Sequence, residues 1–195
     1  PQLDNNQRIG ACVTKPSNFL AIGLNYKAHA EETNSDAPKE PIVFNKSPNC
    51  LIGPNDDVII PKSSNSLDHE VEIAIIIGRK AKYVKEEDAQ NFIFGYCICN
   101  DISEREWQKK RGGQWVKGKS GDTFGPLGPY LVTKDEIGNP YNLNLSLDLN
   151  GKNLDFTSSG TVTINGSSCS ATITASNGET ASFSNMALSN SSGLV

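Results

Sequence analysis

The sequence predicts a mixed α+β domain with several short strands and short helices over residues 1 to about 155. Two apolar runs, Leu67–Gly78 and Phe92–Asp101, are the clearest strands, because both are rich in Ile and other residues that favour strands. The other strands are separated by Gly and Pro turns and cover residues 19–24, 41–44, 58–60 and 143–149. Helices are expected only over residues 26–32, with Asn25 as the N-cap, and 86–90.

The residues around the first long run carry the strongest chemical signal. Glu70 and Glu72 lie two positions apart at the start of a strand, so their side chains point to the same face. The residues that follow are apolar on both faces, which predicts a strand buried on both sides. Asp101 ends the second apolar run. Like charges beside a core are unfavourable unless a cation lies between them or one carboxylate binds a proton.

Three oxygen donors without Cys or His at zinc spacing suit Mg²⁺ or Mn²⁺. We therefore predict a metal site at Glu70, Glu72 and Asp101. The alternative is that Glu70 and Glu72 form the wet face of an ordinary amphipathic strand.

Composition excludes several classes of protein. A formal charge of -4 and a pI near 5.2 argue against a partner that is nucleic acid or an anionic membrane. No apolar run is long enough to span a membrane, and no signal-peptide pattern is visible. Five cysteines without a CxxC pair indicate a reducing, cytoplasmic compartment.

The composition changes at about residue 156. More than half of the positions from there to Val195 are Ser, Thr, Asn or Gly, and only Glu179 is charged. Asn150-Gly151 predicts a hairpin turn, and 161–164 and 171–174 resemble further hairpin strands. We expect a catalytic domain at residues 1–155 and a polar β or poorly ordered segment at 156–195.

Several blocks of sequence resemble the fumarylacetoacetate hydrolase family, in the family's order, over roughly residues 8 to 154. They are Gly23–Glu32, Pro41–Lys46, His69–Glu72, Asn100–Gln108, Gly118–Ser120 and Phe124–Pro129. The resemblance implies a mostly β fold with short helices, of β-roll or sandwich type, around a metal site and usually in a homodimer. It also implies hydrolysis of C–C bonds, decarboxylation or isomerisation of 2-keto acids.

The resemblance also assigns residues. It implies that Glu70, Glu72 and Asp101 are metal ligands and that His29 and Glu32 are a catalytic dyad, whose spacing of three places both on one helix face. The alternative for His29 is a packed or capping histidine. Lys119 matches an active-site lysine, and Arg105, Gln108 and Lys46 match residues that line the substrate pocket.

These roles suggest how a 2,4-diketo acid would be hydrolysed. His29, oriented by Glu32, takes a proton from water, which attacks the distal carbonyl of a metal-bound substrate. The metal and Lys119 then hold the pyruvate enolate. Residues 111–126 are similar to family members that act on 2,4-diketo-3-deoxy sugar acids and are often described as ureidoglycolate lyase-like; a simpler acylpyruvate is the next substrate class.

Three alternatives remain at this stage. The chain could decarboxylate oxaloacetate or isomerise a 2-hydroxy-diene-dioate, because both reactions need the same enolate stabilisation. It could bind a metal or ligand without turnover, since it contains no Gly-Thr-Pro, a segment that lines the family's pocket. The acids could also be purely structural partners of Lys119 and Arg105.

Overall fold

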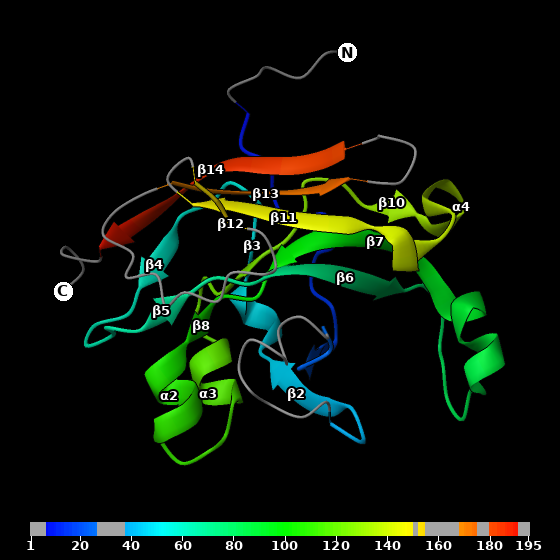
Figure 1. The fold of residues 1–195 in the computed structure, drawn as a ribbon, viewed down its shortest axis with the longest axis horizontal. Coiled ribbons are helices and arrows are strands. Elements are labelled where there is room, and N and C mark those ends of the chain that lie inside the picture. Colours follow the sequence, from blue (N-terminus) through cyan, green and yellow to red (C-terminus); the bar gives the residue numbers. More distant parts are fainter. Residues whose placement is uncertain (1–6, 27–37, 150–151, 155–167, 175–179, 191–195) are drawn as a thin grey trace.

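Strands, most of them paired antiparallel, are the main regular elements of the structure, a computed structural model that describes residues 7–26, 38–149, 152–154, 168–174 and 180–190. The strands are β1 (Phe19–Gly23), β2 (Ile42–Lys46), β3 (Leu51–Ile52), β4 (Val58–Ile60), β5 (Leu67–Asp68), β6 (Val71–Ile77), β7 (Ile93–Asn100), β8 (Ser103–Glu104), β9 (Gly125–Pro126), β10 (Val132–Thr133), β11 (Asn144–Leu149), β12 (Lys152–Leu154), β13 (Ser168–Thr174) and β14 (Thr180–Asn190). The helices are α2 (Arg105–Lys110), α3 (Val116–Lys119) and α4 (Lys134–Ile137), with 3-10 turns η1 (Pro48–Cys50), η2 (Glu86–Phe92) and η3 (Pro140–Asn142). The expected class, mostly β with short helices, is confirmed (Figure 1).

Most of the elements expected from the sequence are found close to their predicted bounds. The strands predicted at 19–24, 58–60 and 143–149 correspond to β1, β4 and β11, and the helical turn at 86–90 is the 3-10 turn η2. The helix expected over 26–32 and the Asn150-Gly151 turn lie largely or wholly outside the described residues. No helix in the described part of the chain is long and apolar enough to cross a membrane.

The hairpin of β6 and β7 is the scaffold for the predicted site. The strands pair antiparallel, with Val71 opposite Asn100 and Glu72 opposite Cys99. The start of β6 therefore lies beside the end of β7, and the backbone N–H of Asp101 donates to the carbonyl of Glu70 at 2.8 Å. This pairing brings together the two strand ends that carry the acidic residues.

The prediction that the strand after Glu72 is buried on both faces is wrong. The strand β6 lies at the edge of the sheet β10-β7-β6, and Ile75 and Ile77 are 52% and 58% exposed. The central strand is β7, which is buried from Gly95 to Asn100. An apolar run shows that a strand can be buried, but its place at the centre or the edge depends on its neighbours.

Two apolar clusters lie on opposite faces of β7, because its side chains alternate. On one face, Ile98 packs with Leu147 and Leu149 of β11. On the other, Cys97 and Cys99 pack with Leu127. In Figure 1 the sheet containing β11, β13 and β14 accordingly lies over the β6–β7 hairpin, while α2 and α3 lie on the far side.

The described parts of the polar C-terminal segment form strands. The strand predicted at 171–174 is confirmed within β13, which pairs antiparallel with β11. The strand β14 pairs antiparallel with β13 and parallel with β4, with Leu188 opposite Val58. The strand predicted at 161–164 lies outside the described residues. The strands β13 and β14 thus belong to one five-stranded sheet, β12-β11-β13-β14-β4. The division of the chain into two parts at residue 155 stays a prediction.

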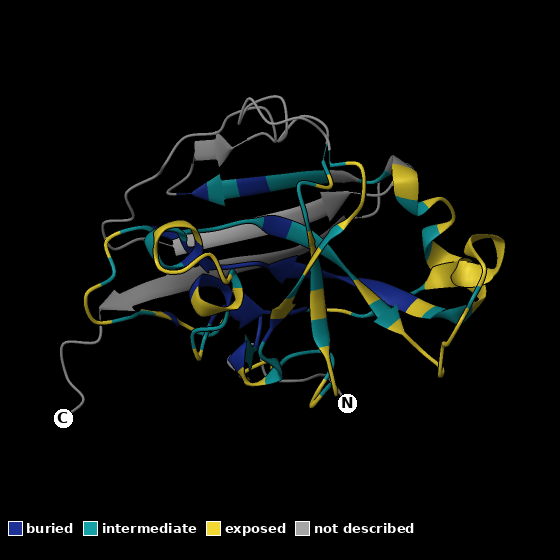
Figure 2. Ribbon diagram, turned by 90° about the horizontal axis from the view of Figure 1, so that it is seen from below, coloured by how far each residue is buried: buried dark blue, intermediate teal, exposed yellow. Residues whose placement is uncertain are grey.

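A fully buried carboxylate fixes the start of helix α2. Glu104 accepts from the backbone N–H of Trp107 at 2.6 Å, which caps the helix. Its other oxygen accepts from Ser66 N–H and Ser64 O–H, both at 3.2 Å. Glu104 therefore ties residues 64–66, which precede β5, to the helix that carries Arg105 and Gln108. Figure 2 shows that buried residues concentrate in the described strands, whereas exposed residues dominate η2 and α4.

Helices α2 and α3 approach so closely that Gly118 has no room for a side chain. A Cβ at this position would lie 2.5 Å from both Gln108 N and Glu104 O, which are backbone atoms and cannot rotate away. We expect Gly118→Ala to lower the free energy of unfolding by about 1–3 kcal/mol, as measured by urea denaturation. Gly10→Ala is the control, because nothing lies within 4 Å of the position that its Cβ would occupy. Equal stability of the two variants would contradict this packing.

Candidate active site

One groove of about 1690 Å³ contains every predicted site residue that the structure describes. These residues are Lys46, Glu70, Glu72, Asp101, Arg105, Gln108 and Lys119. They come from β2, the β6–β7 hairpin, α2 and α3, so the fold gathers positions that are far apart in the sequence. His29 and Glu32, the predicted dyad, lie outside the described residues.

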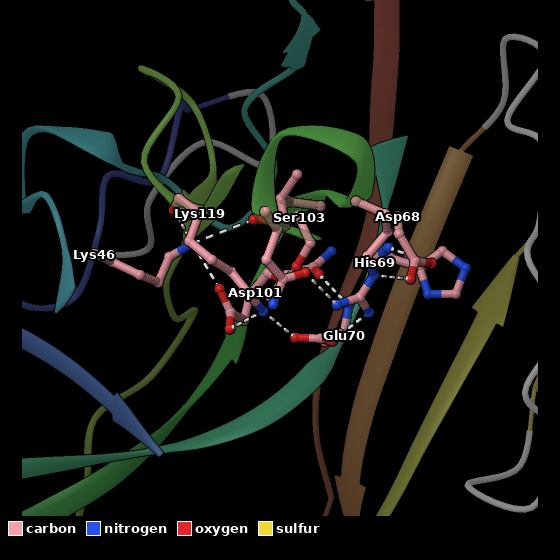
Figure 3. A network of polar contacts seen from close by, with 11 residues as sticks. Lys46, Asp68, His69, Glu70, Asp101, Ser103 and Lys119 are labelled. Atoms are coloured by element: carbon pink, nitrogen blue, oxygen red, sulfur yellow. Dashed lines mark hydrogen bonds and ion pairs between the residues drawn. The ribbon is translucent and has the colours of Figure 1, made fainter. Parts of the chain in front are cut away.

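The ammonium group of Lys119 lies between two carboxylates at the centre of this groove. It donates to Glu70 Oε2 at 2.5 Å and to Asp101 Oδ2 at 2.6 Å (Figure 3). The Lys119 side chain is only 2% exposed. An ammonium removed from water needs such partners. The pairing expected in the structural alternative is therefore present for Glu70 and Asp101.

Arg105 holds the other oxygen of Glu70. Its guanidinium donates to Glu70 Oε1 and, at 2.6 Å, to Asp68 Oδ2. A third donor of the same group reaches Gln108 Oε1 at 3.0 Å. Arg105 remains 21% exposed in the groove, whereas Gln108 is buried. Arg105 thus orients Glu70 and keeps one side open to a bound anion.

The two glutamates differ in protonation. Burial by itself would raise the pKa of Glu70, but Lys119 and Arg105 outweigh it and hold the pKa at about 2. Among the described cations, none forms an ion pair with Glu72. Burial, together with the charges of Glu70 and Asp101, raises the pKa of Glu72 to about 8. Glu70 is consequently ionised at neutral pH, while Glu72 is largely protonated.

Tyr26 shares this environment with Glu72. The two side chains are hydrogen-bonded, and burial beside the Glu72 carboxyl raises the pKa of the Tyr26 hydroxyl. Neither Tyr26 nor Asp68 follows from the sequence analysis as a site residue. Asp68 could have been found, because it is two positions before Glu70 and so continues the spacing of Glu70 and Glu72. Tyr26 carries no comparable signal.

Lys46 is a fully buried member of the groove. Its ammonium is 2.6 Å from Asp101 Oδ1 and donates to the carbonyls of Lys119 and Ile102, at 2.5 and 3.3 Å. These three partners match the three donors of an ammonium group. This position supports a role in orienting Asp101, whereas the prediction that Lys46 binds substrate remains untested.

The described charged groups that meet around Lys119 do not balance in charge. Asp68, Glu70, Glu72 and Asp101 face Lys46, Arg105 and Lys119, which makes four acids for three cations. The proton on Glu72 removes the excess negative charge.

Figure 3 shows His69 directed away from this cluster, and burial lowers the pKa of its imidazole.

Carboxylate oxygens and an excess of negative charge fit a hard divalent cation, which could replace the proton on Glu72. Glu70, Glu72 and Asp101 are the residues that would hold it. As arranged around Lys119, however, no group of three or more His, Cys, Asp or Glu among the described residues is placed to hold a metal ion. The donor set therefore fits the ion, and binding would require Lys119 to release the two carboxylates.

This mostly β fold with its charged groove matches a known class of enzyme. Residues 18–167 match the family model described as the C-terminal domain of fumarylacetoacetate (FAA) hydrolase. The chain belongs to the fumarylacetoacetate hydrolase family, as its sequence blocks predicted. It is thus a member of an enzyme family that generally uses a divalent metal ion.

Curated relatives include proteins from Burkholderia. A Burkholderia cenocepacia protein named "Putative hydrolase" is 52% identical over 151 residues, which are 77% of this chain and 54% of the relative. A Burkholderia multivorans protein is 51% identical over the same shares of both chains. The chain therefore spans about half the length of the curated relatives it matches.

Solved structures with the same fold include isomerases and a hydrolase. The 5-carboxymethyl-2-hydroxymuconate delta-isomerase from Mycobacterium smegmatis has a TM-score of 0.72 and 31% identity, over 95% of this chain and 83% of that chain. The 2-hydroxyhepta-2,4-diene-1,7-dioate isomerase from Mycobacterium marinum has a TM-score of 0.72 and 26% identity, over 95% and 77%. The fumarylacetoacetate hydrolase from Exiguobacterium antarcticum has a TM-score of 0.69 and 34% identity, over 78% and 55%.

The protonation of Glu72 predicts how stability changes with pH in EDTA. In the folded protein the pKa of Glu72 is about 8, above the ordinary glutamate value of 4.5. The protonated Glu72 carboxyl therefore contributes fully to the free energy of unfolding below pH 4.5, and this contribution is lost as the pH rises through 8. We expect Glu72→Gln to become more stable relative to the wild type over this window. A shift of this size allows at most about 5 kcal/mol, and roughly half of that is expected because Glu72 is only partly buried and solvent screens its charge.

Urea denaturation from pH 5 to 9 measures this difference. Glu87→Gln is the matched control, because its carboxylate is 75% exposed on η2. A stability difference between Glu72→Gln and the wild type that stays constant from pH 5 to 9 would contradict the raised pKa.

The buried pair of Lys46 and Asp101 predicts a second effect on stability. Lys46→Met leaves the Asp101 carboxylate with one fewer cation and two carbonyls without their donor, so we expect a loss of about 3–5 kcal/mol in urea denaturation. Adding Asp101→Asn should recover part of this loss. Lys85→Met, at a lysine that is 76% exposed, should change little. A loss that Asp101→Asn does not reduce would mean that packing alone is responsible.

Proposed function

We propose that this chain forms the catalytic domain of a divalent-metal-dependent hydrolase that cleaves a C–C bond in 2,4-diketo acids, of the acylpyruvate or 2,4-diketo-3-deoxy sugar acid type. One observation carries the proposal: Glu70, Glu72 and Asp101 converge beside Lys119 and Arg105 in one groove. A 2-keto acid offers a carboxylate and an adjacent carbonyl, and this arrangement has cations for both.

The chemistry has two requirements, a polarised carbonyl and a stabilised enolate. A bound Mg²⁺ or Mn²⁺, held by the three acids, would supply Lewis acidity at the 2-keto carbonyl. Once released from Glu70 and Asp101, the Lys119 ammonium can donate to the oxygen that gains enolate charge. Arg105 is anchored by Asp68 and Glu70 and is partly exposed, so it can hold the substrate carboxylate.

Hydrolysis also needs a base for the attacking water. We assign this role to His29, with Glu32 orienting its imidazole. Water adds to the distal carbonyl, the bond between this carbon and the methylene breaks, and the products are a carboxylic acid and the enolate of a 2-keto acid, which then takes a proton. Loss of His29 should abolish hydrolysis while leaving any reaction that only needs an enolate.

Isomerisation of a 2-hydroxy-diene-dioate is the second candidate. It is favoured by the two isomerase structures that share this fold at 31% and 26% identity. Such a reaction moves a proton without adding water, and Lys119 and Arg105 would serve it in the same way. The two candidates therefore differ in whether water enters the product.

Turnover of acylpyruvates, a 2,4-diketo-3-deoxy sugar acid and a 2-hydroxy-diene-dioate, each with Mg²⁺, Mn²⁺ or EDTA, tests the proposal. In heavy-oxygen water, hydrolysis splits the substrate and labels the released carboxylic acid, whereas isomerisation keeps the carbon skeleton intact and releases no acid. A labelled released acid, and its loss in EDTA, is the expected result. An isomer with the intact carbon skeleton would assign the second function.

Substitution of Lys119 tests the assigned chemistry. We expect Lys119→Met to lower kcat by about 100-fold or more, because an oriented donor to the developing charge is lost. Lys117→Met is the matched control, since Lys117 is an exposed lysine on the same helix and should leave kcat unchanged. Circular dichroism checks that both variants fold. An equal effect of the two variants would remove Lys119 from the mechanism.

A further inference from the structure

Two cysteines that are distant in the sequence have their thiols in contact. Cys12 lies in the N-terminal segment, and Cys97 lies on the central strand β7. Cys12 packs against the apolar cluster formed by Cys97, Cys99 and Leu127. Within this cluster the Cys12 and Cys97 side chains are hydrogen-bonded to each other. Neither residue takes part in the chemistry of the groove.

The two thiols have different surroundings, and this difference gives them different reactivity. Cys12 is partly exposed, whereas Cys97 is only 4% exposed. The hydrogen bond from Cys97, aided by backbone N–H groups, lowers the pKa of Cys12 against the effect of burial. The same contact and burial raise the pKa of Cys97. Cys12 is therefore the thiol that an oxidant can reach and that ionises first.

We propose that Cys12 and Cys97 form a redox-active pair, in which a peroxide oxidises Cys12 and Cys97 resolves it to a disulfide. The Cys12 thiolate attacks one oxygen of hydrogen peroxide, the O–O bond breaks, and a sulfenic acid forms with release of hydroxide, which takes up a proton as water. The Cys97 sulfur then attacks the Cys12 sulfur. The S–S bond forms, the S–O bond breaks, and the Cys97 proton leaves with the hydroxyl as a second water.

Two other cysteines whose side chains the structure describes, Cys50 and Cys99, have no such arrangement. Cys50 and Cys99 are buried, at 0% and 3% exposure, and burial raises the pKa of both thiols. Both are inert by the same criteria that make Cys12 reactive. Among these four cysteines we therefore predict one disulfide bond, between Cys12 and Cys97.

A disulfide at this place would join the N-terminal segment to the strand that leads to Asp101. Val13 and Pro16 of this segment line the groove, and β7 ends at Asn100, directly before Asp101. The bond would close a long loop and restrict the unfolded chain. We expect oxidation to raise the thermal midpoint and to fix one rim of the groove. A thiol reductant would reverse the change.

Mass spectrometry of the full chain tests the pair without reference to enzymatic activity, so its result is independent of the proposed function. After treatment with hydrogen peroxide and removal of the excess, the intact chain should lose two hydrogen atoms, and a non-reduced digest should contain a peptide linking Cys12 and Cys97. Treatment with dithiothreitol should restore the original mass and lower the thermal midpoint again.

Single variants identify the role of each thiol. Cys12→Ser should abolish the bond and leave Cys97 unmodified, whereas Cys97→Ser should retain a sulfenic acid on Cys12 that reacts with dimedone. Cys50→Ser is the matched control and should form the bond like the wild type. If Cys97→Ser does not fold, the non-reduced digest of the wild type and the peroxide treatment of Cys12→Ser still test whether the Cys12–Cys97 bond forms. Peroxide-treated wild type with both thiols free, or with a different pair linked, would overturn the proposal.

Discussion

The ion pairs of Lys119 with Glu70 and Asp101 are the interaction on which the rest of the groove depends. Three segments meet there: the start of β6, the end of β7 and helix α3. An ammonium that is 2% exposed is stable only with such partners. Because Arg105 and Lys46 hold the second oxygens of the same two carboxylates, each acid is fixed from two sides. The geometry of the site is thus set by buried charges that compensate one another.

Charge balance also explains why Glu72 differs from Glu70. Among the described groups four acids meet three cations, and Glu72 is the acid that forms an ion pair with none of the three, so it binds a proton and is hydrogen-bonded to Tyr26. A divalent ion bound here would favour the ionised form of Glu72 and so release its proton. The same ion would compete with Lys119 for Glu70 and Asp101. Metal uptake and the release of Lys119 toward a substrate would then be linked events.

A few elements, namely β6, β7, α2 and α3, position most of the charged groups of the groove. The antiparallel register of β6 and β7 places Glu70 beside Asp101. Glu104 caps α2 and ties it to residues 64–66, which orients Arg105 and Gln108. Gly118 lets α3 approach α2, and Lys119 follows directly. A hydrolase and an isomerase can share this framework, because both need the same cations around a 2-keto acid.

The sequence by itself determined the class of fold, the family and most of the acidic and basic residues that meet at the site, although it did not give Asp68. These features depend on local properties: strand periodicity, strand ends with carboxylates, and blocks such as Asn100–Gln108 that carry several site residues at once. Described elements such as β1, β4 and β11 follow for the same reason, since each is a short apolar or alternating run between turns.

Only the tertiary structure decided which charges meet and how each is compensated. The exposure of Ile75 and Ile77 on an edge strand, the burial of Lys46 behind Asp101 and the contact of Tyr26 with Glu72 all depend on neighbours distant in sequence. The protonation of Glu72 is such a property too, because it results from burial and from two other carboxylates. Long-range packing sets the local dielectric and the distances between charges, and no local pattern contains either.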